Sequence, residues 1–290
     1  MFLTLIENPA LFLTGVFVLG LLVGSFLNVV ILRLPALMHH EWRGQCRELL
    51  ELEAPAAEPA PPDLVWGGSR CPACGAAIRA HQNIPLLSYV LLRGRCAACG
   101  ARISLRYPLI EGVTAVLFLA VAWHFGPTVQ TLAALVLTGF LVALTGIDAD
   151  HQLLPDNLTL PLLWLGLTLS LFHVFVDPAA SIVGALVGYL SLWFIYHLFK
   201  LITGKEGMGY GDFKLMAALG AWLGWQLLPL VILLSSLVGA AVGLTMLGLR
   251  RHTTGQPMPF GPFIAAAGWI ALLYGDRIID FYLRFSGLVA

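Results

Sequence analysis

Two acidic residues stand at the ends of apolar runs, where a carboxylate is costly unless it has a function. Asp212 opens one such run directly after Gly209-Tyr210-Gly211, and Asp148 closes another. Ionisable residues at membrane depth are rare and mark functional sites by default. Two close carboxylates cannot both ionise easily, so they share a proton, and one can activate water while the other acts as an acid. The pair therefore predicts acid–base chemistry, with peptide hydrolysis as one candidate reaction.

The residues around the two acids suit a site that receives an extended peptide. The glycines before Asp212 allow another backbone to approach closely. A helix over 212–224 rises only about 20 Å, whereas the hydrocarbon core is about 30 Å thick. Asp212 should therefore lie below the membrane surface, in protein or in a water-filled cavity. The supporting positions that we predict are Gly209, Gly211, Asp150, Lys214, Pro259 and Gly261.

The composition predicts a membrane protein. Of 290 residues, 59% are hydrophobic and 11% charged, with a mean hydropathy of +0.86, far from that of ordinary soluble domains. Apolar runs predict eight spans, at residues 10–32, 108–125, 129–147, 158–176, 180–201, 212–224, 227–249 and 260–275. The fold class is therefore an all-α polytopic membrane protein with about eight transmembrane helices. The bilayer is its partner, and a formal net charge of zero gives no basis for a nucleic-acid partner.

The basic residues predict the orientation in the membrane. Those in the hydrophilic stretch between the first two spans are Arg33, Arg43, Arg47, Arg70, Arg79, Arg93, Arg95, Arg102 and Arg106. By the positive-inside rule this stretch is cytoplasmic and the N-terminus lies outside. Alternation then makes 148–157, 202–211 and 250–258 cytoplasmic, which places both acids on that side. The basic residues near these loops agree, and they are Lys200, Lys205, Arg250 and Arg251.

Four cysteines form two C-x-x-C pairs, a specific pattern for a metal site. They are Cys71, Cys74, Cys96 and Cys99, and a glycine follows each pair. Four thiolates on two tight turns offer the tetrahedral sulfur site that Zn²⁺ prefers. Two disulfides or a redox dithiol are the alternative, which a reducing cytoplasmic side disfavours. A closed site of this kind stabilises a fold and leaves no position open for catalysis, so we predict a structural zinc module.

These features divide the chain into three parts. Residues 1–33 form the first transmembrane helix, 34–106 a cytoplasmic loop with the zinc-binding module, and 107–290 a transmembrane domain that carries both acids. We expect the first helix to end at Arg33-Leu34-Pro35. The loop is the place where we expect any further chemistry or gripping of a substrate.

Smaller features add detail to the helices. Gly20 and Gly24 predict close helix packing in the first span. Ser25 and Asn28 share a face of that helix, either for interhelical hydrogen bonds or for a direct role. Asp156 follows a proline and is predicted to cap the fourth span.

Longer motifs across nearly the whole chain resemble those of the type IV prepilin peptidases, bifunctional leader peptidase/N-methyltransferases of bacterial inner membranes. The matching segments are Gly24-Ser25-Phe26-Leu27-Asn28, Arg33-Leu34-Pro35, the two cysteine pairs, Arg106-Tyr107-Pro108-Leu109-Ile110-Glu111, Ile147-Asp148-Ala149-Asp150-His151, Gly207-Met208-Gly209-Tyr210-Gly211-Asp212-Phe213-Lys214 and Pro259-Phe260-Gly261-Pro262.

The resemblance implies a G-x-G-D aspartic endopeptidase with Asp148 and Asp212 in the catalytic positions. It implies cleavage of the basic leader of type IV prepilins and pseudopilins after a glycine, in type IV pilus biogenesis and type II secretion. It also implies N-methylation of the new first residue, usually Phe, with S-adenosylmethionine. No glycine loop of a soluble methyltransferase is present, so the spacing defines no residues that bind this donor.

Two other classes of protein use similar residues. A proton-coupled transporter would place its carboxylates near the middle of the membrane within inverted repeats, whereas these acids are predicted on one side. A membrane-tethered zinc module could serve as an assembly scaffold with incidental aspartates. Replacement of Asp148 or Asp212 by Asn separates these classes, because only a peptidase loses cleavage while it remains folded.

Overall fold

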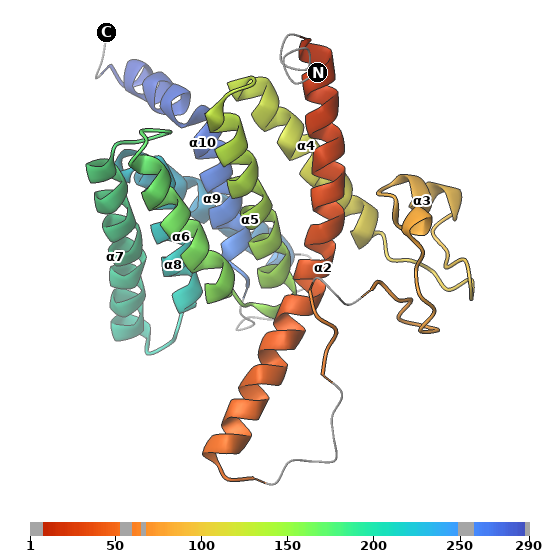
Figure 1. Ribbon diagram of the computed structural model, residues 1–290. Helices are drawn as coiled ribbons and strands as arrows, with labels where there is room; N and C mark the ends of the chain where they lie inside the picture. The colour runs from red at the N-terminus through yellow and green to blue at the C-terminus, as the bar shows by residue number, and fades with distance from the viewer. Residues whose placement is uncertain (1–7, 53–59, 65–67, 249–257, 288–290) are drawn as a thin grey trace. The chain divides into compact units, whose positions relative to one another are not determined.

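The computed structural model describes residues 8–52, 60–64, 68–248 and 258–287, and these ranges are mainly helical (Figure 1). In chain order the elements are α2 (Pro9–Leu49), η1 (Ala80–Asn83), α3 (Leu87–Leu91), α4 (Arg106–Phe125), α5 (Val129–His151), α6 (Asp156–Ser170), α7 (Pro178–Thr203), α8 (Tyr210–Leu223), η2 (Trp225–Leu227), α9 (Leu228–Gly248) and α10 (Gly261–Phe285). Within those ranges β pairing is limited to two isolated bridges. The predicted all-α class is confirmed.

Within the part of the chain that the structure describes, six helical segments are long and apolar enough to cross a bilayer, so the chain is a multi-pass membrane protein. They are α2, α4, α5, α7, the stretch Trp225–Met246 and α10. The predicted count of eight is not confirmed, because α6 has 15 residues and α8 has 14. At about 1.5 Å per residue each rises only about 20 Å. Arg250 and Arg251, which were used to predict the orientation in the membrane, lie outside the described residues.

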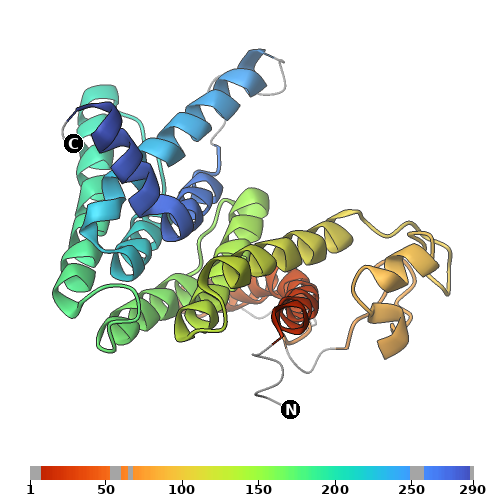
Figure 2. The same ribbon diagram turned by 90° about the horizontal axis from the view of Figure 1, so that it is seen from above.

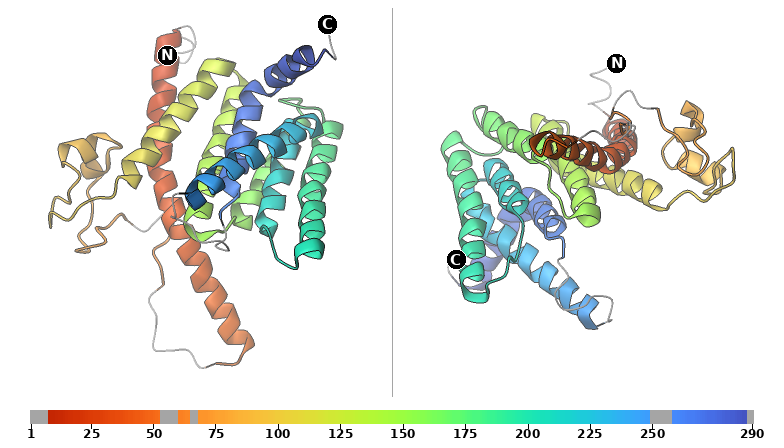
Figure 3. Two further views of the ribbon diagram at one scale, coloured as in Figure 1. Left: turned by 180° about the vertical axis from the view of Figure 1, so that it is seen from behind. Right: turned by 90° about the horizontal axis from the view of Figure 1, so that it is seen from below.

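The chain folds as two compact units, Met1–Pro127 and Thr128–Ala290, which we call unit 1 and unit 2. Unit 1 contains α2, α4 and the cysteine-bearing segment between them. Unit 2 contains α5 to α10, shown from behind and from below in Figure 3.

In unit 1 the two long helices approach closely at glycines of α2. A Cβ at Gly20 would lie 2.6 Å from Cα of Ala115, and one at Gly24 would lie 2.7 Å from Cα of Glu111. Larger side chains would push the helices apart, so the predicted small-residue packing is confirmed. Figure 2 shows α2 beside α4.

The predicted end of the first helix at Pro35 is wrong, because α2 continues through this residue to Leu49. Proline removes one backbone hydrogen bond and crowds the preceding turn, which kinks a helix without necessarily ending it. Figure 1 shows that α2 changes direction part-way along its length. The residues after the kink still form intrahelical hydrogen bonds, so the helix propagates.

In unit 2 the short helix α8 lies in the interior of the bundle. Eleven of its 14 residues are buried, and α6, α7 and α10 pack against it. Gly184 and Gly188 of α7 meet the backbone of α8 directly, at the carbonyls of Gly220 and Met216. A helix too short to span is therefore enclosed by its neighbours, which shield its ends from lipid.

Candidate active site and metal site

Asp148 lies in the last turn of α5 and is only 5% exposed. Its Oδ2 accepts a hydrogen bond of 2.9 Å from the backbone N–H of Gly261, the first residue of α10. A Cβ at Gly261 would lie 2.7 Å from that oxygen, so a larger residue would displace the carboxylate. The predicted supporting position Gly261 thus contacts Asp148 directly.

Asp212 is the third residue of α8 and is only 6% exposed. Its Oδ2 accepts a hydrogen bond of 3.1 Å from the backbone N–H of Gly209, which precedes the helix. A carboxylate in the first turn of a helix also interacts favourably with the free N–H groups there. Gly209 is exposed, so the site has an open side at the G-x-G-D turn.

The fold of unit 2 brings the two acids together, although α6 and α7 separate them in the chain. The side chain of Leu154 lies against both glycine backbones: its Cβ is 2.7 Å from the position of a Cβ on Gly211, and its Cδ2 is 3.1 Å from that of Gly261. Asp148 and Asp212 are close enough to interact electrostatically. The end of α5 and the starts of α8 and α10 lie at one end of the unit (Figure 1).

This arrangement can do acid–base chemistry. Two buried carboxylates near each other favour a state with one shared proton, because burial and like charge both oppose double ionisation. Each is held by a backbone N–H, which fixes its orientation without a neutralising cation. One can then accept a proton while the other donates one.

At the rim of the site, Lys214 pairs with Asp156. The Nζ of Lys214 lies 2.6 Å and 2.8 Å from the two carboxylate oxygens of Asp156, and both side chains are partly exposed. The predicted capping role of Asp156 is wrong, because Pro155 is the N-cap residue and Asp156 is the first helical residue. From that position its side chain points to Lys214 instead of to the backbone of its own first turn.

The other two predicted supporting residues lie nearby in the chain but show different environments. Asp150 is exposed in the last turn of α5, as expected for a residue just past the apolar run. Pro259 is half-buried directly before α10. The prediction for both residues rests on their position in the chain, near Asp148 and Gly261 respectively.

In unit 1 the four cysteines of the two C-x-x-C pairs form a cluster. Their four Sγ atoms all lie within 4.8 Å of one another, and those of Cys71 and Cys99 are 3.9 Å apart. Four Zn–S bonds of about 2.3 Å in a tetrahedron place the sulfurs about 3.8 Å apart. All five cysteines of the chain are free thiols in the structure, which argues against the disulfide alternative. The cluster can bind a metal ion, and its all-sulfur composition fits Zn²⁺.

The two cysteine turns have the same backbone geometry. The N–H of Gly75 bonds the carbonyl of Cys71 at 2.8 Å, and that of Gly100 bonds the carbonyl of Cys96 at 2.9 Å. Both glycines have φ +70°, a conformation that favours glycine. A bridge follows each turn, Arg70 with Ala77 and Arg95 with Arg102. The glycine-containing turns predicted from the sequence are therefore present.

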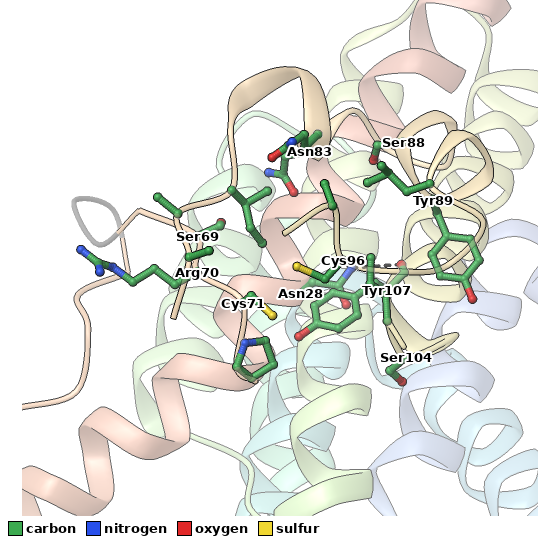
Figure 4. Close-up of a pocket in the computed structure, with 18 of the residues that line it drawn as sticks. Asn28, Ser69, Arg70, Cys71, Asn83, Ser88, Tyr89, Cys96, Ser104 and Tyr107 are labelled. Carbon is green, nitrogen blue, oxygen red and sulfur yellow. Dashed lines mark hydrogen bonds between the residues drawn. The ribbon is translucent and has the colours of Figure 1, made fainter. Parts of the chain in front are cut away.

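A cavity of about 1160 Å³ lies in unit 1 between the cysteine module and the polar faces of α2 and α4 (Figure 4). Its lining includes Asn28 and Glu111, which are 3% and 7% exposed. The sequence pointed to the 34–106 loop as the place for further chemistry but did not predict that both helices would form part of its wall. The only signals were the shared face of Ser25 and Asn28 and a glutamate one turn inside an apolar helix.

The fold and the two sites define a multi-pass membrane protein with a paired-carboxylate centre and a separate four-cysteine centre. Residues 18–125 match the family described as Bacterial Peptidase A24 N-terminal domain, and residues 135–244 match the Type IV leader peptidase family. No solved structure matches the chain.

Curated relatives match along almost the full length. Proteins from Stutzerimonas stutzeri and Pseudomonas aeruginosa are 57% identical, over 98% of this chain and 98% and 97% of their own lengths. A Xanthomonas campestris protein is 49% identical, over 97% of this chain and 98% of its own length. Each is named "Prepilin leader peptidase/N-methyltransferase". The chain therefore belongs to the type IV leader peptidase family, which confirms the resemblance, and it is an enzyme of the peptidase class.

Proposed function

We propose that this protein cleaves the basic leader of type IV prepilins and pseudopilins after a glycine and N-methylates the new first residue, usually Phe. The observation that carries the proposal is the pair Asp148 and Asp212, two buried carboxylates from separate helices that interact in unit 2. Relatives at up to 57% identity carry the corresponding name. Type IV pilus biogenesis and type II secretion are the processes that these substrates serve.

In the proposed cleavage the two aspartates act as one acid–base unit. The ionised carboxylate takes a proton from a water molecule, whose oxygen attacks the carbonyl carbon of the leader's last glycine. The protonated carboxyl donates its proton to the carbonyl oxygen, which gives a tetrahedral intermediate. The carboxyl that took the proton of the water then gives it to the amide nitrogen, the C–N bond breaks, and a hydroxyl proton of the intermediate returns to the other aspartate. The N–H groups of Gly209 and Gly261 hold the two carboxylates in place for these transfers.

The surrounding residues are proposed to position the substrate. Gly209 and Gly211 leave space for the extended segment beside Asp212. The exposed carboxylate of Asp150 attracts the basic leader, while Lys214 and Pro259 shape the rim. Two positions at the rim support this proposal: Lys214 is held by Asp156, and Asp150 is exposed in the last turn of α5, the helix that carries Asp148.

The methylation step is proposed for unit 1. S-adenosylmethionine, when bound, supplies the methyl group for the new amino terminus. The four-cysteine cluster is proposed to hold structural Zn²⁺ through Cys71, Cys74, Cys96 and Cys99. A closed tetrahedral site leaves no coordination position for substrate. The metal would fix the two turns that form one wall of the cavity.

We place the protein in the bacterial inner membrane with a periplasmic N-terminus. The arginine-rich stretch between the first two spans supports a cytoplasmic unit 1 module. A basic leader kept in the cytoplasm then meets the acids at the cytoplasmic side, while the apolar stem of the prepilin stays in the bilayer. The three-part division at residues 33 and 106 describes these proposed roles.

The test is to incubate the purified full-length protein with a prepilin, with and without S-adenosylmethionine, and to measure the mass of the product's N-terminal peptide. We expect loss of the leader in both reactions and addition of one methyl group only with the donor. An intact prepilin in both reactions would contradict the peptidase assignment. Proton flux without cleavage would support the transporter class instead.

A further inference from the structure

The polar end of the unit 1 cavity contains an unpaired acceptor. Both hydrogen bonds of the Asn28 amide nitrogen go to carbonyls, of Gly24 at 3.2 Å and of Tyr107 at 3.1 Å. Because carbonyls can only accept, the amide nitrogen must face them, and the orientation of the side chain follows. The amide oxygen of Asn28 is then buried with no hydrogen-bond partner among the described residues. Such an acceptor is destabilising unless a ligand or water satisfies it.

A buried carboxylate on the facing helix, that of Glu111, lines the same cavity. The carbonyl of Gly24 accepts a hydrogen bond from Asn28. Gly24 also packs against the backbone of Glu111, because a Cβ on Gly24 would lie 2.7 Å from Cα of Glu111. Oε2 of Glu111 accepts a hydrogen bond of 2.8 Å from the backbone N–H of Leu86, and the side chain of Ser25 lies near the carboxylate. Both of these groups are neutral, so neither compensates the charge of an ionised Glu111 carboxylate.

The backbone that contacts Glu111 is strained. Leu86 has φ 57° and ψ −48°, a region that L residues with a side chain rarely adopt. Strained residues of this kind persist where surrounding contacts hold them, and they concentrate at ligand sites. The N–H of Leu86 is the group that bonds Glu111. The strain therefore orients a backbone donor toward a carboxylate that lines the cavity.

We propose that Asn28 and Glu111 form a binding site for an ammonium group. An ammonium is a donor-only cation, and it matches a cavity lined by one unpaired acceptor and one buried carboxylate. The cavity of about 1160 Å³ is large enough for a small ligand. Figure 4 shows Asn28 beside Tyr107, close to the cysteine turns. The inference rests on the proposed methyltransferase activity, which supplies two sources of the group: the methionyl amine of the donor and the new amino terminus of the pilin.

The test is calorimetric binding to the zinc-loaded full-length protein. One arm uses S-adenosylhomocysteine and methylthioadenosine, which lacks the amino-acid part. The other uses a pilin peptide that begins with Phe, in free and N-acetylated forms. In at least one arm the ligand with the ammonium should bind the wild-type protein more tightly, and the Glu111→Gln substitution should weaken that ligand at least about 10-fold. The ligand without the ammonium should be unaffected.

The two arms identify the source. Weakening confined to S-adenosylhomocysteine assigns the site to the donor, and weakening confined to the free peptide assigns it to the pilin terminus. Glu48→Gln is the control, because it makes the same change at an exposed glutamate of α2, the helix that carries Asn28. Zinc content and thermal unfolding of Glu111→Gln are checked against the wild type. The wild-type comparison of paired ligands needs no variant, so it tests the site even where the substitution impairs folding.

The ammonium site is overturned if the wild-type protein binds S-adenosylhomocysteine and methylthioadenosine equally tightly and also binds the free and N-acetylated peptides equally tightly. If the wild type nevertheless methylates cleaved pilin, the proposed function stands and only this inference fails. If it neither methylates nor binds either ligand pair, the methyltransferase assignment fails with it. If Glu48→Gln weakened binding as much as Glu111→Gln does, the assignment of the site to Asn28 and Glu111 would also be overturned.

Discussion

The two polar centres of this protein are built in different ways. In unit 1 the cysteines lie on two short turns with the same hydrogen-bond pattern, each formed within six residues of chain. In unit 2 the aspartates come from α5 and α8, and the backbone that orients Asp148 comes from α10. The first centre depends on local geometry and offers four sulfur ligands to a metal ion. The second depends on packing between helices that are distant in sequence, so its stability and its activity are linked to the whole bundle.

The largest effect is expected at the paired acids. Asp148→Asn or Asp212→Asn should reduce leader cleavage by about 10²- to 10⁴-fold, the usual contribution of a positioned acid or base. Asparagine keeps the size of the side chain but cannot exchange the proton. Initial rates with a purified prepilin measure the change.

The control for these variants is Asp276→Asn, an exposed acid in α10 that belongs to neither site. It should keep most of the activity, and all three variants should retain their helical content by circular dichroism. Wild-type cleavage rates in either Asp148→Asn or Asp212→Asn would contradict the assignment of catalysis to the two buried acids of unit 2.

The second effect is on metal binding in unit 1. Cys71→Ser should lower bound zinc from one ion per chain to well below one, because three thiolates and a hydroxyl hold Zn²⁺ weakly. Methylation should fall more than cleavage, since both acids belong to unit 2. Metal analysis of the purified protein and the two activity assays measure this. The matched control is Cys46→Ser, an exposed thiol outside the cluster.

A third effect compares helix packing in the two units. Gly184→Val in α7 should destabilise the protein by about 1–3 kcal/mol or more, because its side chain would meet the Gly220 carbonyl of α8. Gly24→Val should separate α2 from α4 at Glu111. Gly15→Val is the control, since nothing lies within 4 Å of a Cβ there.

Thermal unfolding in detergent measures the loss of stability in these glycine variants. Because α8 carries Asp212, the change at Gly184 should also reduce cleavage, whereas the change at Gly24 should act on methylation. The reverse pattern of activities would show that the division of function between the units is wrong.

The smallest effect is expected at the rim. Lys214→Gln removes an ion pair whose side chains are 31% and 53% exposed, and such pairs contribute about 0.2–1 kcal/mol. Stability should change little, and the difference from the wild type should shrink further in high salt. Asp156→Asn should have the same effect, with no added loss in the double variant. Unfolding at two salt concentrations measures this, and a large effect on cleavage at all salt concentrations would instead give Lys214 a direct role.

Much of the site could be predicted because its local features carry their own physical signals. Paired C-x-x-C turns with following glycines define a metal site through bond geometry alone. An aspartate next to an apolar run is costly, so Asp148 and Asp212 were recognisable as candidates. The small-residue spacing of Gly20 and Gly24 likewise predicts close packing, because only glycine allows helix backbones to touch.

The tertiary structure decided what depends on contacts between distant segments. The apolar character of α8 predicted a span, but its neighbours enclose it, and hydropathy does not distinguish lipid from protein surroundings. Asp156 was a plausible cap by position, yet Lys214 from another helix is its partner. The unpaired oxygen of Asn28 exists only because two carbonyls occupy its amide nitrogen. Sequence determined which groups can do chemistry, and packing determined which of them meet.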